Sequence, residues 1–284
     1  MKKLLVTALS LFTFTISAQK QDNSLLWKIS GNGLVQPSYL FGTIHITCDA
    51  TLDENVVKAL KDTKQLYLEL DMDNSNLQME MMGYAMMKGG KKMTDLTSPE
   101  DFAVVDSFLQ KELGMSAKMM NTFKPAMVSM MLYSKMMDCP MESFEVELMK
   151  VTKEQNEEVY GLETVAEQMK VFDDIPYQEQ MNELVKTAKD NMVADKAEFK
   201  EMLEVYNTKD LNKILALVNE SDNKMYGDNA DVLLNHRNNN WIPKIEETAK
   251  LTPTFFAVGA AHLGGEEGVI KLLKEKGYKV EAVK

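Results

Sequence analysis

The stretch Leu40–His45, LFGTIH, returns far along the chain as Ala257–His262, AVGAAH. Each copy consists of an apolar strand end, a glycine, two small or apolar residues and a histidine. Glycine lets the backbone turn or approach a ligand closely, so the histidine three positions later can project over a sheet edge. Because His45 and His262 are two of only 3 histidines in the chain, the repeated pattern predicts that two sequence-distant strands build one shared site.

Strand signals lie toward both ends of the chain. Residues 25–30 and 38–42 flank the turn-forming cluster at 31–33, which predicts a β-hairpin. Residues 65–71 alternate so that Leu66, Leu68 and Leu70 share one face, while Tyr67, Glu69 and Asp71 share the other. Further strands are expected over 158–162, 254–258 and 279–283, with a helix over 266–276.

The middle of the chain has helical periodicity, from 74 to 154 and again from 164 to 247. Ser98 and Pro99, followed by two acidic residues, form a helix start signal. We therefore predict an α/β protein with a central mixed sheet built from the N- and C-terminal segments. Helices should flank this sheet, and a large α-helical region is inserted at about 74–155 within a single domain of residues 19–284.

The paired histidines favour either a metal site or an acid/base pair. Imidazole nitrogen binds Zn²⁺, Mn²⁺ or Co²⁺, but two histidines leave a site underdetermined and require a carboxylate partner. Glu69, at the end of the third predicted strand, is the best placed candidate, and Asp71 on the same face is the reserve. The alternative is that each histidine only hydrogen-bonds its own turn.

The acidic charge balance of the chain argues against nucleic acid as a binding partner. Asp and Glu outnumber Lys and Arg by 43 to 32, for a formal charge of −11, so no general basic field exists to bind nucleic acid. Arg237 is the single arginine of the chain. A planar guanidinium beside a site can hold a substrate carboxylate or a developing oxyanion. His236 is adjacent but projects in another direction, so we expect it at the surface or behind the site.

The N-terminus has the order of a signal peptide. Two lysines precede an apolar run over 4–16, and Ser17-Ala18 supplies the small residues that a signal peptidase prefers. We expect residues 1–18 to be a signal peptide cleaved near Ala18, which makes the protein periplasmic or secreted. The rest of the chain has no stretch of 18 apolar residues, so we expect no integral membrane segment in the mature protein. The alternative is a buried N-terminal helix.

If the protein is exported, its 2 cysteines enter an oxidising compartment. Cys48 follows His45 by three residues, and Cys139 lies far along the chain. In an oxidising compartment these residues can form a disulfide that clips the helical region to the loop carrying His45. Two free thiols, or one thiolate joining a metal, are the alternatives.

Methionine is the most biased residue type, with 23 in the chain, of which 17 lie between Met72 and Met149. Many spacings are three or four residues, which is typical of the apolar face of a packed helix. Methionine side chains also adapt to varied partners, so these helices could instead line a groove for an unfolded peptide or a lipid. A third alternative is Cu(I) binding by thioethers.

The motifs together resemble the TraB/GumN family, which includes the Tiki metalloproteases and is distantly similar to ChaN haem-uptake proteins and erythromycin esterases. The resemblance spans nearly the whole mature chain and is weakest in the central helices. It is carried by the following segments: 26–28, 39–45, 67–69, 161–164 with Gln168, 237–238, 258–263 and 277–280.

The resemblance implies a divalent-metal-dependent peptidase whose core residues fall here on His45, Glu69 and His262, with Arg237 beside them. In that interpretation the two histidines and Glu69 hold Mn, Co or Zn, and Arg237 acts as an oxyanion or carboxylate clamp. Glu163 is a candidate to take a proton from water, or else a helix-start acid. The esterase relatives indicate acid/base chemistry without an obligate metal, so an ester bond is a second substrate class.

A binding module is the alternative from a different functional class. The same pocket, or the methionine-rich helices, would then take up a peptide, a lipid or copper without catalysis. The bond cleaved, the metal and the oligomeric state do not follow from the sequence.

Overall fold

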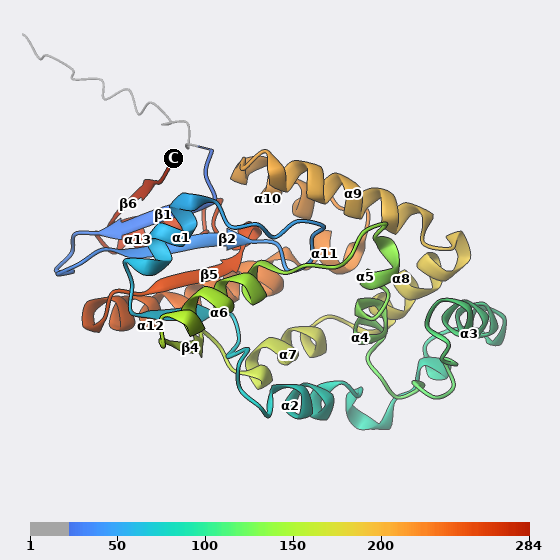
Figure 1. The fold of residues 1–284 in the computed structure, drawn as a ribbon. Helices are drawn as coiled ribbons and strands as arrows, with labels where there is room; N and C mark the ends of the chain where they lie inside the picture. The colour runs from blue at the N-terminus through green and yellow to red at the C-terminus, as the bar shows by residue number, and fades with distance from the viewer. Residues whose placement is uncertain (1–22) are drawn as a thin grey trace, which may run out of the picture.

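The structure is a computed structural model that describes residues 23–284, so the predicted signal peptide lies outside the described residues. A six-stranded sheet has the spatial order β4-β3-β5-β2-β1-β6. The strands are β1 (Leu26–Ser30), β2 (Ser38–Thr43), β3 (Gln65–Leu68), β4 (Glu158–Gly161), β5 (Phe255–Gly259) and β6 (Lys279–Ala282). Figure 1 shows the sheet at one end of the molecule and most of the helices extending away from it.

The sheet is mixed, as the sequence predicted. β2, β5, β3 and β4 pair in parallel, whereas β1 pairs antiparallel with both β2 and β6. The predicted hairpin of β1 and β2 is therefore confirmed, and the C-terminal strand lies on its outer side. The α/β fold class is confirmed. Four parallel strands end at one edge, where open α/β sheets carry their sites.

Apolar strands and helices form one core around this sheet. Leu40, Leu66, Phe255 and Phe256 are fully buried, and Phe41 packs edge-on against Phe144 at 5.7 Å between ring centroids. The helices that contribute to this core are α1 (Glu54–Lys61), α6 (Phe144–Glu154), α9 (Val193–Asn207), α10 (Leu211–Asn219), α12 (His236–Leu251) and α13 (Val269–Glu275).

The remaining helices form a separate body with its own cores. α3 and α4 both pack on α8, and α2 packs on α7, so segments before and after β4 join in this body. The predicted start of α3 is confirmed, because the Ser98 hydroxyl accepts a hydrogen bond from the Asp101 N–H at 3.1 Å. These helices are α2 (Leu77–Tyr84), α3 (Pro99–Leu113), α4 (Pro125–Met130), α5 (Tyr133–Met136), α7 (Val165–Asp174), α8 (Tyr177–Asp190) and α11 (Lys224–Gly227).

A buried ion pair lies inside the helical body. The Lys124 ammonium is 1% exposed and lies 2.8 Å from the Asp173 carboxylate. Lys88 and the Tyr177 hydroxyl also contact Asp173. Burial works against ionised Asp173, but these donors outweigh it and lower the pKa of that carboxyl. The pair therefore depends on both partners keeping their charge.

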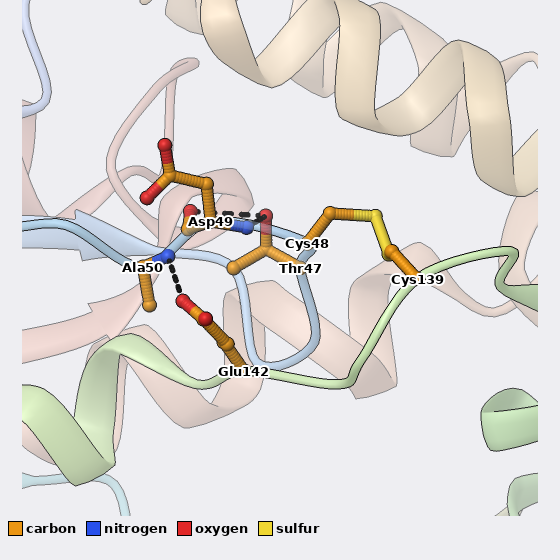
Figure 2. The surroundings of a disulfide bond; sticks show 6 residues. All are labelled: Thr47, Cys48, Asp49, Ala50, Cys139 and Glu142. Atoms are coloured by element: carbon orange, nitrogen blue, oxygen red, sulfur yellow. Dashed lines mark hydrogen bonds between the residues drawn. A yellow bond between two sulfur atoms is a disulfide. The ribbon is translucent and has the colours of Figure 1, made fainter.

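The predicted disulfide is present and joins Cys48 to Cys139 across 91 residues. Figure 2 shows the bond beside a short bridge between the loop after β2 and the segment that leads into α6. In that bridge Thr47 pairs with Glu142, and the Glu142 carboxylate accepts the Ala50 N–H at 2.9 Å. The segment 139–145 is thereby tied to the loop carrying His45, and we call it the strap.

The methionines divide between core and surface. Met93, Met120, Met181 and Met192 are buried, which agrees with helix packing. Met79, by contrast, is 75% exposed. Within residues 23–284, no helix is both long and apolar enough to cross a membrane.

Candidate functional site

Four acidic or imidazole side chains stand at the carboxyl ends of four adjacent strands. Glu163 follows β4, Glu69 follows β3, His262 follows β5 in a single 3₁₀ turn, and His45 follows β2. Their order along the sheet edge is the order of the strands. Arg237 reaches the same place from the first turn of α12. The structure therefore brings together all four residues that the sequence selected, His45, Glu69, Arg237 and His262.

The two Gly-x-x-His motifs lie side by side because β2 and β5 are paired. Gly42 stands opposite Val258, and Thr43 stands opposite Gly259. A Cβ at Gly42 would lie 3.1 Å from Ala260, which is tighter than nine in ten real Cβ contacts. The first glycine is needed for the close approach of the two motifs, and this approach places both histidines over one edge.

Both imidazoles direct Nε2 toward the same carboxylate oxygen. His45 Nε2 lies 3.7 Å from Glu69 Oε1, and His262 Nε2 lies 3.8 Å from it. The same oxygen accepts the Gly259 N–H at 2.8 Å. The Gly259 N–H thus holds the Glu69 carboxylate in front of both imidazole rings.

The other nitrogen of each ring is held from behind. His45 Nδ1 lies 2.8 Å from Glu145 Oε1, and His262 Nδ1 lies 2.7 Å from Asn238 Oδ1. The Asn238 amide donates to two backbone carbonyls, of His262 and Glu267. Its oxygen therefore faces His262, so Nδ1 carries the proton and the Nε2 lone pair points into the site.

Arg237 uses every N–H that it has. Nε donates to Glu163, Nη1 donates to the Leu233 carbonyl and to His262 Nε2 at 3.1 and 3.2 Å, and Nη2 donates to Glu69 Oε2 at 2.6 Å and to Glu163. A guanidinium has five donors in a fixed fork. A substrate oxygen would therefore have to replace one of these partners in order to bind Arg237.

Trp241, one turn after Arg237 on α12, closes the inner side of the site. Its ring lies 4.8 Å below the Arg237 guanidinium and 4.5 Å from the His262 ring. Its Nε1 donates to Glu163 at 3.3 Å. Gln168 Nε2 donates to both Glu69 and Glu163, at 3.2 and 3.1 Å. The two carboxylates are therefore fixed on several sides.

The two histidines have opposite electrostatic surroundings. Burial first, and then the Arg237 charge, lower the pKa of His262 to about 3, so its ring is neutral. Partial desolvation also acts against a charge on His45, but the Glu69 and Glu145 carboxylates outweigh it and raise the pKa of His45 to about 9. The His45 side chain is 59% exposed, whereas that of His262 is 4% exposed. His45 is therefore the imidazole that solvent can reach.

The two carboxylates beside Arg237 also differ. Burial disfavours ionised Glu69, but the charges of Arg237 and the two histidines dominate and hold the pKa of Glu69 far below its usual range. Burial raises the pKa of Glu163 and exceeds the opposing effect of Arg237. Glu69 therefore binds a proton more weakly than Glu163 does.

The residue types and the free space between them fit a divalent metal. A Cβ on Gly259 would lie 3.4 Å from Glu69 Oε1, 3.5 Å from His262 Cδ2 and 3.7 Å from His45 Nε2, so the missing side chain leaves a small cradle among the three. Tetrahedral ligand atoms at ordinary zinc distances are about 3.4 Å apart. As the side chains stand, no group of three or more His, Cys, Asp or Glu residues within 23–284 is placed to hold a metal ion. To hold an ion, each histidine Nε2 would have to move a few tenths of an ångström closer to Glu69 Oε1, from 3.7 Å for His45 and 3.8 Å for His262. His262 Nε2 would also have to leave Arg237.

Three residues of the site escaped sequence reasoning as site residues. Glu145, Asn238 and Trp241 contact the histidines or Glu163, and each lies on a helix. Asn238 lies in a segment that carries the family resemblance, but the sequence assigns no role to it. The predicted disulfide was the one signal for Glu145, because it joined the region around Cys139 to the His45 loop. Asp71, the reserve ligand, interacts instead with Asp73, and exposed His236 pairs with Asp231 at 3.1 Å.

Comparison with known proteins adds a family likeness. The model of the TraB/PrgY/gumN family matches residues 25–282. Metalloprotease TIKI1 of Danio rerio is 26% identical over 99 residues, which covers 34% of this chain and 19% of that protein. The chain thus aligns with about a fifth of the length of this curated relative. No solved structure matches the chain.

Proposed function

The chain belongs to the TraB/PrgY/gumN family, and on that premise we propose that it is a metal-dependent hydrolase that cleaves peptide bonds, with ester bonds as the second substrate class. The similarity to Metalloprotease TIKI1 supports hydrolysis. His45, Glu69 and His262 would hold the ion, and Arg237 would fix Glu69.

One observation carries this proposal. The Nε2 atoms of both imidazoles face one oxygen of Glu69, while both Nδ1 atoms are hydrogen-bonded to a fixed acceptor behind the ring. Histidines that bind metal commonly have this second hydrogen bond, because it sets the tautomer and the ring orientation. A pair of histidines that only satisfied their own turns would not need to share a carboxylate.

A divalent ion bound there would polarise the scissile carbonyl and bring the pKa of a water molecule toward neutrality. The residues of the chain do the rest. Neutral His262 and ionised Glu69 would supply a buried donor pair on the inner side. Exposed His45 would supply the outer donor after its ring has released a proton. A substrate approaching from solvent therefore meets His45 first.

Arg237 acts mainly through its neighbours in this proposal. Its guanidinium lies between Glu69 and Glu163 and balances the charge that both carboxylates bring into a buried place. Because all five donors are engaged, stabilisation of an oxyanion by Arg237 requires one contact to be exchanged during the reaction. The Leu233 carbonyl and the His262 ring are the partners at Nη1, the nitrogen that metal binding would partly release.

Metal analysis and cleavage together test the proposal. Purified protein should contain, or take up, about one equivalent of Mn, Co or Zn, and His45→Ala and His262→Ala should each abolish tight uptake. Wild-type protein should then cleave unfolded peptides in a metal-dependent manner, and both variants should be inactive. Absence of both uptake and cleavage in wild-type protein would favour the binding-module alternative.

Export is a second part of the proposal. The signal-peptide pattern over residues 1–18 and the Cys48–Cys139 disulfide support a periplasmic or secreted location, because disulfides persist in oxidising compartments. N-terminal sequencing of the protein from its native compartment tests this. A start near Gln19 is expected, and an intact N-terminus on cytosolic protein would refute export.

A further inference from the structure

Glu145 is a buried carboxylate whose contacts are with polar groups around His45. It is 5% exposed and lies in the first turn of α6. His45 Nδ1 and the Thr43 hydroxyl lie 2.8 and 2.7 Å from Oε1, and the Ser143 hydroxyl donates to Oε2 at 2.6 Å. Ionised carboxylates are costly to bury unless such donors surround them.

An ordinary role at the start of a helix does not account for this arrangement. Acidic residues in a first helical turn gain from nearby backbone N–H groups. Both Glu145 oxygens instead accept from side chains, and two of these donors, Thr43 and His45, lie on β2 and the loop after it. Glu147, the other acidic residue in the first turn of α6, is the comparison. Its carboxylate pairs with Lys150 on the same helix at 2.6 Å.

We propose that Glu145 is a positioning residue for His45, which it holds with Nε2 directed at Glu69. The inference rests on the proposed function for its catalytic meaning, although the positioning itself needs no metal. His45 requires such support more than His262 does, because the His45 side chain is 59% exposed and stands on a loop, whereas His262 is enclosed by Trp241 and Asn238.

The strap supplies Glu145 from a distant part of the chain. The Cys48–Cys139 disulfide and the Thr47–Glu142 bridge join the strap to the loop on the far side of His45. Ser143, within the strap, fixes the second oxygen of Glu145. His45 is therefore held between its own strand and a strap that is covalently tied to the same loop.

The test uses the full chain with two substitutions at this position. Glu145→Gln keeps an oxygen that can accept the Nδ1–H of His45 but removes the charge, whereas Glu145→Ala removes both. Glu147→Gln, on the same helix, is the matched control. Ring ¹⁵N signals of histidine-labelled, metal-free protein report the position of His45, and the 3 histidines are assigned by single substitutions. Zn²⁺ affinity is measured in parallel.

Glu145→Ala should shift the His45 ring signals, leave those of His236 unchanged and weaken Zn²⁺ binding about 10- to 100-fold, with Glu145→Gln intermediate. Glu147→Gln should match wild type. Unchanged His45 signals in folded Glu145→Ala protein would overturn the proposal. If the signals shift but wild-type protein binds no Zn²⁺, the proposed function fails while the positioning role of Glu145 stands.

Discussion

Arg237 Nη2 lies 2.6 Å from Glu69 Oε2, and the same nitrogen contacts Glu163. One guanidinium, 12% exposed, thus balances two carboxylates that are each less than 10% exposed. Removing one partner from such a group leaves uncompensated buried charge, which is strongly destabilising. The single arginine of the chain is therefore part of the scaffold of the candidate site.

Arg237→Ala should lower the free energy of unfolding by about 3–5 kcal/mol, because Glu69 and Glu163 lose their shared cation. Urea denaturation measures this change. His236→Ala is the control, since His236 is exposed, and should stay within about 0.5 kcal/mol of wild type. An Arg237→Ala protein as stable as this control would show that the carboxylates do not depend on the guanidinium.

Gly259→Ala should fill the cradle without disturbing the fold. The added Cβ meets its neighbours at 3.4 Å or more, which is ordinary contact, so we expect a stability change below about 1 kcal/mol. Metal uptake should fall at least tenfold, as measured by titration calorimetry. Gly83→Ala on α2 is the control, because nothing lies within 4 Å of its added Cβ. Undiminished uptake by Gly259→Ala would place the ion elsewhere.

Asp173→Asn should destabilise the helical body, because Lys124 would remain buried without a counter-charge. A loss of about 3–5 kcal/mol is expected at pH 7. The folded pKa of Asp173 is lowered, so its stabilisation is complete above the unfolded value of about 4 and disappears as pH falls through the folded value.

The difference between wild type and Asp173→Asn should therefore shrink below about pH 4. Denaturation curves from pH 7 to pH 3 measure it, with Asp174→Asn as control. Asp174 pairs with exposed Lys170 on the surface, and its loss should cost less than about 1 kcal/mol at any pH. A constant difference for Asp173→Asn across this range would contradict the assignment.

Reduction of the Cys48–Cys139 disulfide should destabilise the protein. The bond closes a loop with a sequence separation of 91 residues, and loss of a bridge of this size typically costs about 2–5 kcal/mol. Thermal denaturation with and without reductant measures the effect. A Cys48→Ser/Cys139→Ser variant should be as stable as reduced wild type and should not respond to reductant. If wild type and variant are equally stable with and without reductant, the strap is held without the disulfide.

Much of the sheet was predictable because its signals are local. The turn cluster at 31–33 defines the hairpin. A glycine with a histidine three positions later marks the ends of β2 and β5. The extent of β3 was overpredicted, since the alternation continues to Asp71 while the strand ends at Leu68. Beyond Leu68 the chain turns close against Gly161, where a Cβ would lie 2.6 Å from the Asp71 nitrogen, and no periodicity encodes that contact.

The site was predictable where its residues follow strands and hidden where they lie on helices. His45, Glu69 and His262 each follow a strand, so strand ends alone brought them together. Glu145 and Asn238 act through long-range packing of α6 and α12, and the helical pattern of those segments reports only which face is apolar. Rarity in the composition, not position, identified Arg237.

Metal binding by wild type, His45→Ala, His262→Ala and His236→Ala proteins tests the central claim most directly. Calorimetric titration with Zn²⁺ and Mn²⁺ should give one tight site in wild type and in His236→Ala, and no tight site in the other two variants. A tight site that survives both His45→Ala and His262→Ala would contradict the assignment of the metal to the paired Gly-x-x-His motifs.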